Sequence, residues 1–156
     1  VVRVLGEFGY DSREDRAFLQ SFDLDALKYA RFELNCDLKL IQLIGENSWH
    51  ESPSDFNYLR SEAGLSEIAS FAEGIGPWLP QVLELSGKNS GQSTGLIEAA
   101  QRHGLQVHAY TLRADQLPGT IGSIDDAMYI LRERLGLDGV FTDHPDQVIH
   151  YLQAGN

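Results

Sequence analysis

The sequence has little positive charge. Its 156 residues include 12 lysines and arginines against 23 aspartates and glutamates, which gives a net charge of −11. Nucleic-acid binding depends on lysine and arginine side chains that neutralise phosphates, so this balance argues against a nucleic-acid partner. An anionic substrate would be repelled unless a metal ion or a focused arginine compensated for the acidic excess.

Cysteine and long apolar runs are equally scarce. Cys36 is the single cysteine, which excludes a disulfide within the chain. No stretch approaches the roughly 18 apolar residues of a membrane-spanning helix, so no membrane span is expected. The chain opens without an initiator methionine, and Val1, Val4 and Leu5 recur at helical spacing before Gly9. We therefore expect that the chain has lost its beginning.

Motifs that carry chemistry by themselves are also missing. EGIGP (73–77) lacks the lysine and serine of a phosphate-binding loop, and no GxSxG nucleophile motif occurs. No HxxxH, HxH or HExxH spacing relates the five histidines, which are His50, His103, His108, His144 and His150. The sequence therefore predicts neither a serine hydrolase nor a metal site built on histidines.

A repeated unit of apolar run, polar loop and amphipathic helix fills the chain. The apolar runs cover residues 17–22, 38–44, 74–78, 106–112 and 139–143. Helices are predicted after Asp23, over 61–72, 93–104 and 123–136, and from Pro145 through Leu152. Strands that alternate with helices predict a parallel sheet, hence an α/β fold.

A barrel is favoured over an open sheet. The polar residues collect at the C-terminal ends of the predicted strands, where long loops follow, as in TIM barrels. Five strands cannot close a barrel of eight. The sequence thus predicts one partial domain over residues 1–156, an incomplete (β/α)8 barrel.

Asp143 and His144 end the last apolar run and leave two interpretations open. In the first, His144 is a general base that Asp143 orients. In the second, His144 stands at the N-cap before Pro145, and Asp143 bonds loop amides or the helix N-terminus. Adjacent side chains on an extended segment point to opposite sides, which disfavours the first interpretation.

Other candidate side chains lie in or after the predicted strands. His108 is expected to be a packed, hydrogen-bonded histidine, whereas Tyr110 is better placed to meet a ligand. Arg113 either offers a fork to a phosphate or forms a surface ion pair with the acidic excess. Phe22 either walls an apolar pocket or packs in the core. Two strand glutamines, Gln20 and Gln42, serve either as interior hydrogen-bonding groups or as part of a polar site.

Five segments together resemble the C-terminal half of glycerophosphodiester phosphodiesterases, in their bacterial, often periplasmic, branch. The segments are LQSFDLDALK (19–28), LIQLIGENSW (40–49), FAEGIGPW (71–78), VHAYTLRADQLP (107–118) and GLDGVFTDHPDQVIHYL (136–152). The resemblance implies strands 4–8 of a TIM barrel. It also implies hydrolysis of glycerophosphodiesters to glycerol 3-phosphate and an alcohol, by two histidines and a divalent cation, Ca²⁺ or Mg²⁺, held by carboxylates.

The chain departs from the family at the catalytic segments. The family's HRG segment, its PENT or PEHT segment, and its Glu-x-Asp and Glu-x-Lys strands precede the matched part and have no counterpart here. The resemblance therefore assigns no catalytic residue and no metal ligand to this chain. It places Phe22, Tyr110 and Arg113 on the alcohol side of the substrate pocket, and Gln42 is a further candidate.

These observations predict a fragment of a metal-dependent phosphodiesterase that is inactive alone and binds no metal by itself. Its expected partners are a small glycerophosphodiester and either the missing N-terminal half or a second copy joined through exposed sheet edges. Two other functions stay open: a non-enzymatic half-barrel that binds a partner or itself, and a related phosphodiesterase acting on lysophospholipids. The family branch favours a periplasmic location.

Overall fold

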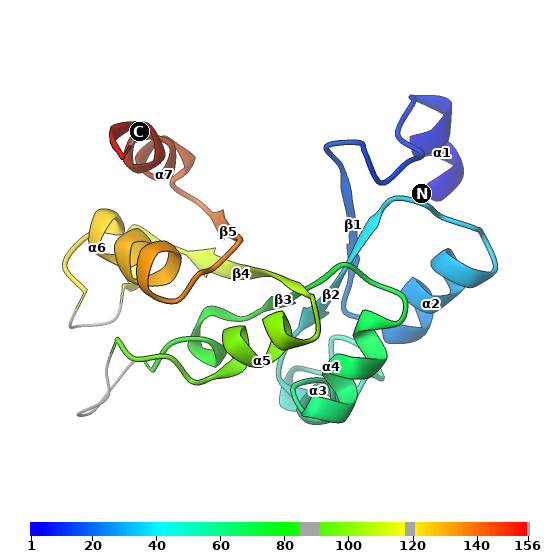
Figure 1. The fold of residues 1–156 in the computed structure, drawn as a ribbon, viewed down its shortest axis with the longest axis horizontal. Coiled ribbons are helices and arrows are strands. Elements are labelled where there is room, and N and C mark those ends of the chain that lie inside the picture. The colour runs from blue at the N-terminus through cyan, green and yellow to red at the C-terminus, as the bar shows by residue number, and fades with distance from the viewer. Residues whose placement is uncertain (85–90, 118–120, 156) are drawn as a thin grey trace. The chain divides into compact units, whose positions relative to one another are not determined.

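A computed structural model describes residues 1–84, 91–117 and 121–155 of the chain (Figure 1). Contacts divide the chain into two compact units. The first comprises Val1–Gly76 and His103–Leu105, and the second comprises Pro77–Arg102 and Gln106–Asn156. The single partial domain expected over 1–156 stays a prediction.

The first unit alternates strands with helices in chain order. Its strands follow one another as β1, β2 and β3, and β1 pairs with β2 in parallel, with Leu19 opposite Leu40. Its elements are α1 (Val2–Glu7), β1 (Phe18–Ser21), α2 (Leu24–Phe32), β2 (Lys39–Ile44), the 3₁₀-helix η1 (Asn47–Trp49), α3 (Phe56–Leu59), α4 (Glu62–Ala69) and β3 (Gly74–Pro77). The runs 17–22, 38–44 and 74–78 are therefore confirmed as strands to within one residue at each end.

Helix starts in the first unit follow the predicted capping chemistry. The Asp23 carboxylate accepts hydrogen bonds from the backbone N–H groups of Asp25 and Ala26, which confirms Asp23 as an N-cap. Glycine has a low helix propensity, so Gly64 is unfavourable in the predicted helix 61–72. The structure shows that a glycine is nevertheless required at this position. A Cβ at Gly64 would lie 2.2 Å from the Tyr58 carbonyl oxygen, so only glycine allows the turn between α3 and α4 to close this tightly.

The second unit repeats the alternation. Its strands β4 and β5 pair in parallel, with His108 opposite Gly139, and Trp78 just after β3 forms a parallel bridge with Tyr110. The elements are η2 (Leu79–Gln81), α5 (Leu96–Arg102), β4 (Gln106–Leu112), η4 (Ala114–Gln116), α6 (Ile124–Met128), η5 (Tyr129–Arg134), β5 (Gly139–Thr142) and α7 (Pro145–Ala154). The runs 106–112 and 139–143 are likewise confirmed as strands.

The helix predicted over 123–136 is only partly regular. Ser123 caps it by accepting from the Asp126 N–H, and Gly136 ends it at a φ of +70°, both as predicted. Between them, however, α6 stops at Met128 and η5 continues as a π-helix. The Leu135 N–H donates to the Ile130 carbonyl, five residues back, at 3.0 Å. The helix predicted over 123–136 is therefore present over 124–134, but apolar spacing does not distinguish its wider π-helical turn from an α-helical one.

The two outermost strands have one strand neighbour each among the described residues. β1 pairs with β2, and β5 pairs with β4. Along β1 the side chains of Phe18 and Gln20 are exposed. Side-chain exposure does not report on the backbone edge, so the exposed edge, or a partner covering it, expected at 17–22 stays a prediction. None of the helices in the described part of the chain has the length and apolar character needed to cross a membrane.

Candidate functional site

The loop after β1 is held at a single carbonyl oxygen. The Phe22 carbonyl accepts hydrogen bonds from Gln42 Nε2 at 3.0 Å, Ser52 Oγ at 2.9 Å and Ser54 Oγ at 3.0 Å. Gln42 belongs to β2 and both serines belong to the loop that follows it. Three side chains thus fix the C-terminal end of β1 relative to the end of β2, which is where parallel-barrel enzymes place their substrates.

Gln42 is fully buried, with 0% of its surface exposed. Its Nε2 also lies 3.3 Å from the Ser21 carbonyl and 2.9 Å from the Leu43 carbonyl, so its orientation is set by three acceptors for two hydrogens. Its Oε1 is buried with no partner among the described residues. Gln42 therefore serves as an interior hydrogen-bonding group, which is the first of the two roles considered for it. Its place in a substrate pocket stays a prediction. Gln20, by contrast, is exposed.

Aromatic rings gather around Gly45 at the end of β2. Phe22 packs edge-to-face on Phe56, with ring centroids 6.0 Å apart and planes at 80°. A Cβ on Gly45 would lie 3.0 Å from Trp49 Cε3 and 3.4 Å from Phe22 Cε1. Trp49 was not among the residues predicted for the site. The signal that could have identified it was a tryptophan in a polar loop directly after a buried strand.

Tyr110 and Arg113 lie in the second unit, at the end of β4. Tyr110 is half-buried and Arg113 follows the strand. Arg113 Nε lies 3.2 Å from Asp143 Oδ2 and 3.5 Å from Asp115 Oδ1, so the predicted ion pair with acidic neighbours is present. The Nε atom is buried, and neither contact has the geometry of a hydrogen bond. The fork to a phosphate stays a prediction.

Asp143 and His144 take separate roles at the end of β5. His144 stands at the N-cap position of α7 but makes no capping bond with its side chain. Its backbone N–H donates to Thr142 Oγ1 at 2.9 Å instead. The Asp143 carboxylate was expected at loop amides or the helix N-terminus, and it lies beside Arg113 because that residue ends the neighbouring strand.

His108 is packed, as predicted, against β5. A Cβ on the opposing Gly139 would lie 2.9 Å from His108 Cδ2, so the imidazole fills the space that glycine leaves. Burial lowers the pKa of His108 below its ordinary value, and the nearby Asp138 carboxylate acts in the opposite direction. This environment favours the neutral ring.

The described residues do not fit a resident divalent cation. Across 1–84, 91–117 and 121–155, no three or more histidine, cysteine, aspartate or glutamate side chains come together in a group able to hold one. A Ca²⁺ or Mg²⁺ site needs several carboxylate or carbonyl oxygens around one point.

The chain matches the glycerophosphoryl diester phosphodiesterase family over residues 1–147. The chain belongs to this family. It is 31% identical to the glycerophosphodiester phosphodiesterase of Haemophilus influenzae, over 98% of this chain and 46% of the relative. It is 27% identical to the corresponding enzyme of Treponema pallidum, over 96% of this chain and 46% of the relative. The chain thus spans about half the length of these curated relatives.

A solved structure supports the fold of this family member. The crystal structure of a protein from Silicibacter pomeroyi, described as a glycerophosphoryl diester phosphodiesterase, has a TM-score of 0.59 at 19% identity. The likeness covers 97% of this chain and 41% of that one. It confirms an α/β fold of parallel strands that is consistent with part of a TIM barrel.

Proposed function

We propose that this chain is the C-terminal portion, about strands 4–8, of a metal-dependent phosphodiesterase barrel. The whole protein would hydrolyse glycerophosphodiesters to glycerol 3-phosphate and an alcohol. The observation that carries this proposal is the family match over 1–147, together with a chain that covers 46% of the Haemophilus influenzae relative. The two carboxyl-end clusters, around Phe22 and around Arg113, support it because barrel enzymes bind substrate at that end.

In this proposal the chain supplies one wall of the substrate pocket. In the first unit, Phe22, positioned by Gln42, would contact the alcohol part of the diester. The same role is proposed for Tyr110 of the second unit separately, from the sequence resemblance alone. Arg113 would turn its guanidinium to the phosphate, exchanging carboxylate neighbours for a phosphoryl oxygen. The catalytic histidines and the carboxylates that hold Ca²⁺ or Mg²⁺ would belong to the part of the barrel that this chain does not match.

The test compares two proteins. One is the product of the whole gene that encodes this chain, and the other is the 156-residue chain. The whole product should release glycerol 3-phosphate from glycerophosphocholine or glycerophosphoethanolamine, and a chelator should abolish the release. If the upstream sequence lacks the HRG and Glu-x-Asp segments, or the whole product releases an alcohol only from lysophospholipids, the proposed substrate is wrong.

The open edge of β1 favours a second candidate, a module that associates with another copy of itself. Phe18 is 44% exposed on a strand whose outer hydrogen-bonding groups face no other described strand. Light scattering during size exclusion would give a dimer mass for this module and a monomer mass if the edge stays unpaired. Substituting Gln20 by lysine would place a charge on the exposed strand and disperse such a dimer.

A further inference from the structure

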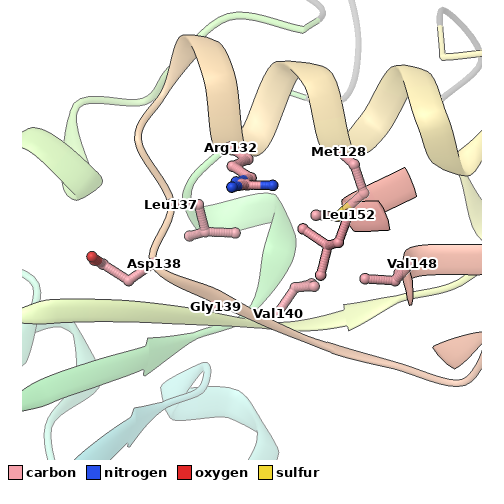
Figure 2. Close-up of a pocket in the computed structure, with 8 residues that line it drawn as sticks. All are labelled: Met128, Arg132, Leu137, Asp138, Gly139, Val140, Val148 and Leu152. Carbon is pink, nitrogen blue, oxygen red and sulfur yellow. The ribbon is translucent and has the colours of Figure 1, made fainter. Parts of the chain in front are cut away.

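A cavity of about 320 Å³ lies in the second unit, on the helix-covered side of β5 (Figure 2). Its lining combines apolar side chains with two charged residues and one glycine, namely Met128, Leu137, Val140, Val148, Leu152, Arg132, Asp138 and Gly139. They come from α6, the π-helix η5, the turn before β5, β5 itself and α7. Its volume is at the low end of the range, about 300–1,000 Å³, that small-molecule sites use.

The cavity is lined by residues at the start of β5, the end opposite Asp143. Leu137 precedes the strand, Val140 is its second residue, and Asp143 follows its last residue. Met128 and Arg132 are four residues apart across the junction of α6 with η5, so both face the same side of the helical segment. The substrate-pocket residues proposed above belong to the other end of the strands.

The two charged groups at the cavity differ in how they are engaged. Asp138 Oδ2 accepts a hydrogen bond from the Val107 N–H at 2.9 Å, and its side chain points away from the apolar residues in Figure 2. Figure 2 shows the Arg132 guanidinium beside Leu137, and the arginine side chain is 46% exposed. Its nearest carboxylate, that of the adjacent Glu133, lies 3.6 Å from Nε, which is too far for a good hydrogen bond.

From this arrangement we propose that the cavity binds a short anionic amphiphile, an alkyl chain with one carboxylate or phosphate head group. The alkyl chain occupies the space between Met128, Val140 and Leu152, where it loses contact with water. The head group lies against Arg132, whose planar fork suits carboxylate and phosphate oxygens. The net charge of −11 repels anions, so the head group depends on Arg132 for its binding.

The test is a calorimetric titration of the 156-residue chain with four octyl compounds below their micellar concentrations. Octanoate and octyl phosphate should bind, and octanol should bind about tenfold more weakly because it lacks the charge-assisted hydrogen bonds. Octyltrimethylammonium should show no binding. The ratio of octanoate to octyl phosphate affinity distinguishes a fatty acid from a phosphate lipid as the source of the ligand.

Two variants locate the binding. Arg132→Gln should reduce octanoate affinity to that of octanol and leave octanol unchanged, whereas Arg134→Gln, exposed on the same π-helix, should change neither. Val140→Phe should remove binding of both, with circular dichroism confirming that the variant is folded. Equal affinity for octanoate and octanol, undiminished binding in Val140→Phe, or an equal loss in Arg132→Gln and Arg134→Gln would each overturn the proposal.

Discussion

The two units begin a strand with the same arrangement of an acid followed by glycine. In the first unit, Glu73 precedes β3, its Oε2 accepts from the Leu40 N–H at 2.7 Å, and its own N–H donates to the Leu40 carbonyl at 3.0 Å. In the second, Asp138 precedes β5, its Oδ2 accepts from the Val107 N–H at 2.9 Å, and its N–H donates to the Val107 carbonyl at 3.2 Å. In both units the acid joins two neighbouring parallel strands at their starts.

The surroundings of the two acids differ. Glu73 pairs with Arg31, whose side chain is 10% exposed and also donates to the carbonyls of Phe71, Cys36 and Leu38. Asp138 has the half-buried His108 nearby and lines a cavity. In the first unit the acid that bonds the neighbouring strand is thus part of a buried charge network. In the second unit the corresponding acid lines a cavity. The first unit should depend far more on its acid than the second.

The largest effect is expected at Glu73. Glu73→Gln leaves the Arg31 charge buried without its carboxylate, which should lower the free energy of unfolding by about 3–5 kcal/mol. Asp138→Asn keeps an acceptor for Val107 and should lower it by about 1 kcal/mol. Urea unfolding measures both. Similar losses in the two variants would show that the arginine adds nothing to the shared arrangement.

Arg13 provides the control for this result. It also contacts Glu73, at 2.9 Å, but its side chain is 51% exposed. Arg13→Met should therefore change stability by no more than about 1 kcal/mol. A loss in Arg13→Met as large as that in Glu73→Gln would contradict the assignment of the stabilisation to the buried arginine.

A smaller effect is expected at Gln42. Gln42→Leu removes the donor shared by three carbonyls and should destabilise the first unit by about 1–3 kcal/mol. Gln20→Leu, on the exposed edge strand, is the matched control and should stay within about 0.5 kcal/mol of the parent. Equal effects at the two glutamines would mean that the buried amide is not what holds the Phe22 loop.

Gly139 tests the glycine of the second unit. A Cβ there would meet the His108 ring at 2.9 Å, so Gly139→Ala should displace the imidazole and destabilise by about 1–3 kcal/mol. Gly6→Ala, in α1 with no atom within 4 Å of the added Cβ, should instead stabilise by up to about 1 kcal/mol. Unfolding curves and the His108 ring resonances report the two outcomes. An unshifted ring in Gly139→Ala would refute the packing described for this pair.

The smallest effect is the pH dependence of His108. Because burial lowers the pKa of His108 in the folded state, the unfolded chain binds the proton more tightly. Its contribution to stability is complete above the ordinary histidine pKa of about 6.5 and declines as pH falls toward and through the folded value. The difference in stability between the parent and His108→Gln should therefore shrink on going from pH 7.5 to pH 5.5. A constant difference would refute the shift.

Strand positions could be predicted from sequence because apolar runs bounded by glycine or aspartate determine them locally, as at 106–112. The burial of single side chains could not. Gln20 and Gln42 look alike in sequence, yet the first lies on an edge strand and the second on a strand with neighbours on both sides. The burial of a side chain depends on whether its strand has neighbours on one side or on both. The apolar pattern within one strand does not indicate the number of neighbours.

The candidate site shows the same division. Phe22, Tyr110 and Arg113 could be proposed from sequence because they lie at or near the ends of apolar runs within distinctive segments, and their place in a substrate pocket stays a prediction. The partner of Arg113 could not be proposed, since Asp143 lies 30 residues away in sequence and becomes a neighbour only when β5 pairs with β4. The arginine network around Glu73 depends likewise on contacts between residues far apart in sequence, which no local motif indicates.

The most direct measurement of the central claim is an assay of the purified 156-residue chain with glycerophosphocholine and saturating Ca²⁺ or Mg²⁺. The claim is that this chain provides a wall of the substrate pocket and none of the catalytic groups. It predicts no release of glycerol 3-phosphate above the protein-free blank. Sustained release that requires the metal and disappears in Arg113→Ala would contradict it, since the catalytic groups would then lie within these residues.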